Sequence, residues 1–398
     1  IVARDADGNI VSEVRSRSAR LTSDNYIILT FPQAKNIKTL TVSLAEVEGG
    51  GARVSISEMA FYKSSTLADD IANLFEDNAF TSLKSNIQID DIEALETKLN
   101  ATSSYYMDIE RLRDEISLAK SLLTEAPDLW VIKNDFVSRS ANNDNTKFGQ
   151  SASALQPIGI TAKANSNIAI YAEIPEGESV YIIPTQYYGE SGVWKGSPIK
   201  LENGRNYITV PKIGSLSATR GGALYLTYSG ENADNIKIHV RGNSNEVFKT
   251  PILDLSNWYN MSVEERKTVI SAYITELQSY VNNIGVSSSD LPVSIRNSTE
   301  IATPSVLLSM PANQILNGLA NASTSSAYNN LTSILNTASI ETMTENMYQN
   351  ILAWEEELFV ANMVQGIIPA DTDFATYQYP METRQNIRYM RMFAGAFM

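Results

Sequence analysis

Six short segments of strand type follow one another between residues 158 and 242, and they constrain the fold more than any other feature of the sequence. They are IGITAKA, NIAIYAEI, SVYIIPTQYY, NYITVP, GALYLTYS and NIKIHVRG. Turn-forming stretches such as PEGES and LENGR separate them. Short strands at this spacing are typical of a two-sheet antiparallel sandwich. We therefore predict a jelly-roll-like β-sandwich over residues 128–250.

The fifth segment predicts how this sandwich is packed. Its two leucines and Tyr228 fall on one face of the strand, and Tyr225 falls on the other. We expect the leucine face to lie in the core and Tyr225 to face a neighbouring subdomain. Gly221 and Gly222 precede the leucines, and we expect them to permit a close-packed entry into the strand.

Residues 65–127 change to a helical period. Apolar residues recur three or four positions apart in three groups, which are Leu67, Ile71, Leu74 and Phe75; Ile92, Leu95 and Leu99; and Ile109, Leu112, Ile116, Ala119 and Leu123. Pro127 follows the third group and is expected to end its helix. Three amphipathic helices with short links predict a small bundle that acts as a spacer.

Residues 1–64 again have strand character. NYIILTF, TLTVSL and RVSISEMAFYK are rich in β-branched and aromatic residues. So few strands do not make a stable sandwich. We expect the C-terminal part of a β-sandwich, with its partner strands upstream of Ile1.

The last third, residues 251–398, is predicted to be largely helical. Ser262 and Glu265 have the spacing of a capping box, and a longer helix is expected over about 341–364. PSVLLSM is a candidate strand. The chain starts at Ile1 and closes on RYMRMFAGAFM, so we expect a fragment cut at both ends. The predicted fold class is multidomain α+β.

Composition excludes several functions. The net charge is −14, and no Lys/Arg stripe is present, which argues against nucleic-acid partners. No apolar run reaches the length of a membrane span, so we expect no membrane insertion. The chain has no cysteine, which excludes disulfides and thiolate zinc sites within it.

Candidate catalytic residues are few. His239 is the only histidine and falls between Lys237 and Arg241 on one strand face, where we expect a half-exposed residue with a structural or surface role. A Ser–His–Asp triad that includes His239 is the alternative, although no G-x-S-x-G motif is present in the sequence. An H-E-x-x-H zinc motif needs two histidines, so it cannot lie in this chain. DADGN at 5–9 departs from a calcium loop and is expected to form a turn.

The run of three glutamates at 355–357 is a candidate for a paired-carboxylate site. Consecutive residues on a helix splay around its axis and do not converge. We therefore expect Glu355, Glu356 and Glu357 to form a solvated face beside a Trp354/Leu358 core stripe. We assign no catalytic residue and no metal ligand in this chain.

Aromatic residues supply the candidate binding site. Tyr187, Tyr188 and Trp194 lie in TQYYGESGVWKG, which is expected to be a loop or hairpin of the sandwich. Exposed aromatic rings at such positions can stack on the apolar faces of sugar rings. Packing within the core or hairpin is the alternative for each of them.

Several stretches resemble a known family. GGALYLTYSG followed by IKIHVRG resembles the paired strands near the end of the N-terminal β-subdomain in the enhancin-like, mucin-directed zinc metallopeptidases. SVYIIPTQYYGESGVWKGSPIKLENGRNYITVP fits that subdomain in order and spacing, and FATYQYPMETRQNIRYMRMFAGAFM resembles the segment leading toward the family's catalytic helix. RVSISEMAFYK resembles the last strand of discoidin-type, galactose-binding-like sandwiches.

The resemblance implies a domain order. Residues 1–64 would be the end of a galactose-binding-like β-sandwich and 65–127 a three-helix spacer. Residues 128–250 would be the β-sandwich subdomain of the peptidase-like region and 251–398 an incomplete, largely helical segment of its catalytic region.

The resemblance also implies a function. The parent protein would be a hydrolase: a bacterial zinc metallopeptidase, secreted or on the cell surface, that acts on glycoproteins such as mucins. The zinc ligands would lie beyond this chain, so the chain alone would be inactive. The alternative is a non-catalytic carbohydrate-binding or adhesin protein built from the same modules, and a third is a spacer without a ligand. Partners would be glycoproteins or mucin-type glycans.

Overall fold

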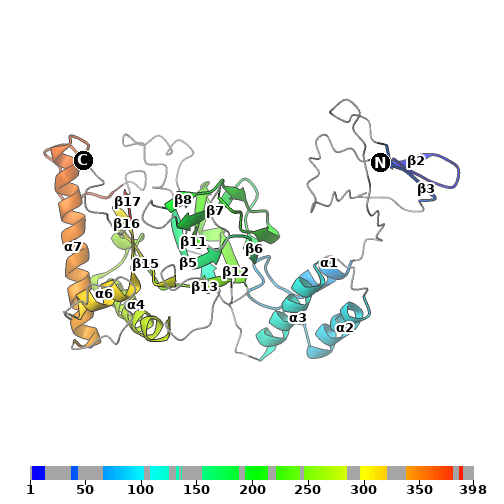
Figure 1. The fold of residues 1–398 in the computed structure, drawn as a ribbon, viewed down its shortest axis with the longest axis horizontal. Coiled ribbons are helices and arrows are strands. Elements are labelled where there is room, and N and C mark those ends of the chain that lie inside the picture. Colours follow the sequence, from blue (N-terminus) through cyan, green and yellow to red (C-terminus); the bar gives the residue numbers. More distant parts are fainter. Residues whose placement is uncertain are drawn as a thin grey trace. The chain divides into compact units, whose positions relative to one another are not determined.

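The structure is a computed structural model. It describes residues 2–13, 37–43, 66–102, 108–124, 131–133, 136, 155–187, 193–213, 221–242, 246–284, 296–320, 338–379 and 385–388. The chain divides into two compact units, Ile1–Ser64 and Ser65–Met398, and each is considered by itself. Together the described residues form a mixed α/β structure with several antiparallel sheets (Figure 1).

The first unit contains a small antiparallel sheet. Its strands lie in the order β2 (Ile10–Glu13), β1 (Val2–Arg4) and β3 (Thr39–Thr41). The DADGN stretch connects β1 to β2 as the predicted turn, in which an Asp5 carboxylate oxygen accepts hydrogen bonds from the backbone N–H groups of Asp7 and Asn9. The predicted strand TLTVSL contains β3, whereas NYIILTF and RVSISEMAFYK lie outside the described residues.

The three predicted helices of the second unit are confirmed. They are α1 (Leu67–Ala72), α2 (Ile89–Asn100) and α3 (Ile109–Leu123). The apolar residues that predicted them contribute to one core cluster, except Leu123, which is exposed. The third helix ends at Leu123, with Thr124 as its C-cap, which is earlier than the predicted stop at Pro127.

Two antiparallel sheets follow, and they contain all six predicted strands. The first has the order β10 (Gly204–Thr209), β6 (Asn167–Glu173), β12 (Lys237–Gly242), β4 (Val131–Lys133). The second has the order β13 (Val247–Lys249), β5 (Gln156–Lys163), β11 (Gly221–Ser229), β7 (Ser179–Tyr187), β8 (Val193–Lys195), with β9 (Ile199–Lys200) also paired to β7. Side chains from both sheets enclose one apolar core. The jelly-roll connectivity stays a prediction.

Strand β11 lies between β5 and β7, and its faces are as predicted. Its leucines and Tyr228 point into the core between the sheets, while Tyr225 packs on the other side against Ala302 and Leu307. A Cβ atom placed on Gly222 would lie 2.5 Å from the carbonyl oxygen of Thr185 on β7. The glycine is therefore required for the close approach of these two strands.

Helix α3 is bound to the outer face of the first sheet by a buried ion pair. The guanidinium of Arg205 on β10 donates to both carboxylate oxygens of Glu115, from Nε at 2.9 Å and from Nη2 at 2.7 Å. The hydroxyl of Tyr207 donates to the same carboxylate at 2.6 Å, and Nη2 of Arg205 also donates to the carbonyl oxygen of Ala68. The charges of the pair thus have several partners each.

A third, mixed sheet lies in the last part of the chain. Its order is β14 (Ile252–Asp254), β15 (Thr299–Ala302), β16 (Val306–Met310), β17 (Gln385–Arg388). The predicted strand PSVLLSM contains β16. Strand β15 is parallel to β14 and antiparallel to β16, and β16 is parallel to β17. The sequence predicted a largely helical segment with one candidate strand here, whereas the structure has a four-stranded sheet beside the helices.

Helices α4 (Val263–Ile284), α6 (Ala312–Leu319) and α7 (Ile340–Val364) share a core with this mixed sheet (Figure 1). Residues of β15 and β16 also pack against the β7–β11 face of the sandwich. Two polar contacts also join the sandwich to the mixed sheet. Lys133 Nζ lies 2.8 Å from a carboxylate oxygen of Asp254, and the Tyr225 hydroxyl donates to Glu300. No helix among the described residues is both long and apolar enough to span a membrane.

Candidate functional site

Two of the three residues predicted to bind glycans lie in described strands. Tyr187 ends β7 and Trp194 lies in β8, which is paired to it. The register places Gln186 opposite Trp194 and Val193 opposite Tyr187, so the two aromatic residues are not cross-strand partners. Tyr188 lies outside the described residues. The hairpin placement is therefore confirmed for two of them, and the glycan contact stays a prediction.

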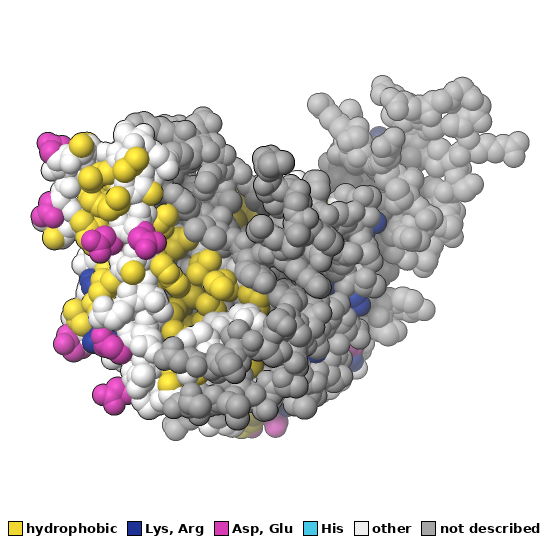
Figure 2. Space-filling model, turned by 60° about the vertical axis from the view of Figure 1, so that its left-hand side comes forward, with side chains coloured by type: hydrophobic (Ala, Val, Ile, Leu, Met, Phe, Trp, Pro, Cys, Tyr) yellow, Lys and Arg dark blue, Asp and Glu magenta, His cyan; other side chains and the backbone are white. Residues whose placement is uncertain are grey.

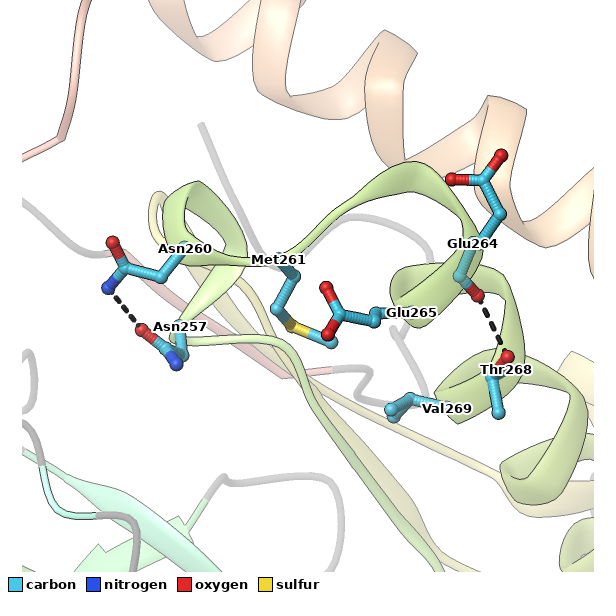
Figure 3. A pocket seen from close by; sticks show the side chains of 7 residues that line it. All are labelled: Asn257, Asn260, Met261, Glu264, Glu265, Thr268 and Val269. Atoms are coloured by element: carbon cyan, nitrogen blue, oxygen red, sulfur yellow. Dashed lines mark hydrogen bonds between the residues drawn. The ribbon is translucent and has the colours of Figure 1, made fainter.

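An open groove lies at the start of helix α4. It encloses about 470 Å³ and is lined by Asn257, Asn260, Met261, Glu264, Glu265, Thr268 and Val269 (Figure 3). The short 3-10 helix Trp258–Asn260 with the residue on either side of it, and the first turns of α4, supply these side chains. Its lining combines amides and carboxylates with two apolar side chains, a mixture that suits a polar ligand with some apolar surface.

Most of the polar groups in this groove already bind one another. The Asn260 amide donates to the Asn257 side-chain oxygen at 2.6 Å, and the Thr268 hydroxyl donates to the backbone carbonyl of Glu264. The predicted capping box is confirmed, because Glu265 accepts from the Ser262 N–H at 2.7 Å and donates its own N–H to the Ser262 hydroxyl. These hydrogen bonds lower the pKa of Glu265, which therefore serves the helix end.

Trp258 follows the groove residue Asn257 in the chain and lies in a stack of aromatic and cationic groups. The guanidinium of Arg266 lies 4.0 Å from the centre of the Trp258 ring and donates to the Trp258 carbonyl. On α7, Tyr348 stacks on Trp258 with ring centres 5.8 Å apart. The stack fixes α4 against α7 and is a structural arrangement.

The prediction that Glu355 is part of a solvated face is wrong. Its side chain is buried, and its carboxylate accepts hydrogen bonds from the hydroxyls of Thr303 and Ser305, in the turn between β15 and β16. The next two residues, Glu356 and Glu357, are exposed as predicted. The three glutamates point in different directions around the helix axis, as predicted, but the first of them points into the interior.

Burial raises the pKa of Glu355 above its usual value, although the hydroxyl groups of Ser305 and Thr303 oppose this shift. A carboxyl group whose pKa is higher in the folded than in the unfolded state favours folding at low pH. That contribution is fully present below the unfolded pKa and is lost as the pH rises through the folded pKa.

We therefore expect Glu355→Gln to stabilise the protein at pH 7, by about 1 kcal/mol, because the amide keeps an acceptor for both hydroxyls without a buried charge. Urea unfolding between pH 4 and pH 8 measures this. The advantage should shrink toward pH 4, and the matched variant Glu356→Gln should have little effect at any pH. A gain of Glu355→Gln that is the same at every pH would contradict the account.

The prediction that His239 is half-exposed is wrong, and of its two predicted roles the structure supports the structural one and not the surface one. The side chain is fully buried, and Nδ1 lies 3.0 Å from the carbonyl oxygen of Ala79. Its ring contacts that of Tyr171 on β6. The loop after α1 covers this strand face, and Lys237 binds Asp77 of the same loop at 2.9 Å.

The described residues do not fit a zinc site. Among them, no group of three His, Cys, Asp or Glu side chains could hold a metal ion. The single histidine of the chain lies inside the second unit against a backbone carbonyl. Two-histidine zinc ligation therefore has no counterpart in this chain.

Comparison with known proteins identifies similar folds. No family model matches the sequence, and no curated protein matches it. The solved structure of the CBM32-1, CBM32-2 and M60 catalytic domains of ZmpB from Clostridium perfringens is 17% identical, covers 85% of this chain and 31% of that chain, and has a TM-score of 0.50.

Two further solved structures have lower TM-scores. A metallopeptidase from Bacteroides thetaiotaomicron is 16% identical and covers 76% of this chain and 42% of that chain, with a TM-score of 0.41. The M60 catalytic domain of ZmpC from Clostridium perfringens, in complex with the sialyl T antigen, is 17% identical. It covers 67% of this chain and 46% of that chain, with a TM-score of 0.40.

The similarity to the ZmpB structure concerns the fold. The chain shares its mixed α/β architecture with a structure that contains two CBM32 domains and an M60 catalytic domain. It spans 31% of the length of that structure. A shared fold does not by itself assign the activity or the substrates of that larger protein to this chain.

Proposed function

We propose that this chain is the N-terminal part of a secreted zinc metallopeptidase that acts on glycosylated proteins such as mucins. The fold similarity to the ZmpB structure, over 85% of this chain, is the observation that carries the proposal. It agrees with the resemblance of GGALYLTYSG and IKIHVRG to strands of the enhancin-like peptidases. Strands β11 and β12 cover all but one residue of each stretch.

The zinc motif of the proposed enzyme would lie in polypeptide beyond this chain. The described residues offer no zinc ligand set, and the sequence has only one histidine. In the proposed enzyme the bound zinc would activate the attacking water. The chain alone would be inactive, and its part would be to support the catalytic domain and to position the substrate.

The proposed division of labour follows the predicted domains. Residues 1–64 would be the end of a galactose-binding-like sandwich, 65–127 a helical spacer, 128–250 the sandwich subdomain and 251–398 the start of the catalytic region. Glycan contact is proposed for Tyr187, Tyr188 and Trp194, near the β7–β8 hairpin. A glycoprotein substrate implies a secreted or cell-surface location.

The test is to extend the coding frame past Met398 by about one domain and to express the longer protein. We expect an H-E-x-x-H helix with a downstream acidic ligand, about one zinc ion per protein, and cleavage of mucin. The matched control changes only the glutamate of that motif to glutamine, which should retain zinc and lose cleavage. A continuation without paired histidines would overturn the proposal, and glycan binding by that protein would then favour the non-catalytic carbohydrate-binding alternative.

A further inference from the structure

An exposed apolar patch lies at the C-terminal end of helix α7. Val364 is 82% exposed and Val360 is 48% exposed, one helical turn apart. Met363 and Ile367 lie beside them and are half-buried. These four residues are called the α7 patch. In Figure 2, hydrophobic side chains gather at the upper left, with Asp and Glu side chains at their margin.

The α7 patch rests on a well-packed base. Phe359, Ile368 and Tyr379 form a buried cluster beneath it. The chain after the helix folds back, so that the rings of Phe374 and Tyr377 lie 5.2 Å and 5.4 Å from that of Phe359. Contiguous apolar side chains on a fixed surface with a polar rim can mark an interaction site.

The surroundings of the patch are acidic. Glu356 and Glu357 precede Val360 by one turn and are exposed. Asp371 and Asp373, in the segment that folds back, are exposed as well. The sequence has no Lys, Arg or His between residues 340 and 383. The cation Lys267 of α4 lies at the other end of the helix, where it binds Glu345.

This charge pattern selects among possible occupants. The four exposed carboxylates around the patch are called its acidic margin. A two-fold pairing of two copies would place this margin against an identical one, which is repulsive. An anionic membrane surface or a nucleic acid would be repelled for the same reason. A cationic polypeptide with apolar side chains would satisfy both the valines and the carboxylates.

We propose that the α7 patch is a docking surface for a basic segment of polypeptide that carries apolar side chains. The apolar side chains of the partner would cover Val360 and Val364, and its Lys or Arg residues would face the acidic margin. The inference stands independently of the peptidase proposal, because it uses only the surface of α7 and the segment after it.

The test uses the full chain and a fluorescently labelled 14-residue lysine/leucine peptide with helical spacing of its leucines. Fluorescence anisotropy should show saturable binding that weakens as salt is raised. Val364→Ser should weaken it about tenfold, which is the scale of burying one valine side chain. Glu356→Lys with Glu357→Lys should weaken it by about tenfold at low salt.

The controls separate docking at this patch from general adhesion. Val263, on α4, is 41% exposed, so Val263→Ser removes a comparable exposed valine elsewhere and should leave binding unchanged. A glutamate/leucine peptide of the same design should not bind. Equal binding of the two peptides, or binding that survives both patch variants, would overturn the proposal. So would concentration-dependent dimerisation that Val364→Ser abolishes. Unchanged melting midpoints establish that the variants are folded.

Discussion

Replacing Glu115 with alanine is expected to destabilise the second unit by about 3–5 kcal/mol, the usual range for breaking a buried ion pair from one side. The Glu115 side chain is 0% exposed and that of Arg205 is 18% exposed, so water cannot readily replace the lost carboxylate. Alanine would leave the guanidinium of Arg205 and the hydroxyl of Tyr207 without this acceptor. Urea unfolding measures the loss in free energy of unfolding, and the contact between α3 and β10 should be the first to be lost.

Two variants of helix α3 serve as controls. Glu115→Gln keeps one acceptor oxygen and the side-chain volume, so its loss should be smaller than that of alanine. Glu110→Ala removes a glutamate that is 77% exposed and pairs with Arg113 on the surface, and its effect should be below about 1 kcal/mol. Equal effects of Glu115→Ala and Glu110→Ala would show that the buried pair does not hold α3 to the sandwich.

Replacing Gly222 with alanine is expected to destabilise the sandwich by about 3 kcal/mol, at the upper end of the range for overpacking a core. The added Cβ would lie 2.5 Å from the carbonyl oxygen of Thr185 and 2.8 Å from its carbonyl carbon. These are backbone atoms of β7, so β11 and β7 would have to separate. The same change at Gly318 in α6 is the control, because nothing lies within 4 Å of the added atom there.

Gly318→Ala should be neutral or should stabilise the protein by up to about 1 kcal/mol, since alanine favours a helix. Urea unfolding of both variants makes the comparison. A Gly222→Ala protein as stable as the parent would show that the strands tolerate wider spacing, and the glycine would then have no packing role.

Strands and helices with one apolar face could be predicted from the sequence. The six sandwich strands and the helices α1, α2, α3 and α7 each have apolar residues at a regular period. That period reports the face an element turns toward its nearest core. It correctly placed the leucines of β11 inside and Tyr225 on the opposite side. Short strands such as β14 and β17 have three or four residues, too few to establish a period.

The burial of polar residues could not be predicted in the same way. Glu355 is inside because the turn between β15 and β16 meets α7, and His239 is inside because the loop after α1 covers β12. In both cases the covering segment lies at least 50 residues away in the sequence. Periodicity describes one element at a time, so such contacts leave no local signal.

The candidate sites were predictable to different degrees. The hairpin that carries Tyr187 and Trp194 could be placed from turn residues, but turn residues do not fix which side chains meet. The groove at the start of α4 was signalled only by the capping box of Ser262 and Glu265. The α7 patch is formed by the helix together with the segment that folds back after it, and its exposure depends on that packing.

The sandwich is covered on the outside of both sheets, by Phe80 and its neighbours over Tyr171 and by Ala302 and Leu307 over Tyr225. Strands β6 and β11 therefore have no side that faces water along these stretches, and mutations there meet a packing constraint whichever way the side chain points. Evolutionary variation should accordingly concentrate in the connecting loops and at the strand ends. A ligand of this sandwich would have to approach along its rim, since these two flat faces offer it no room.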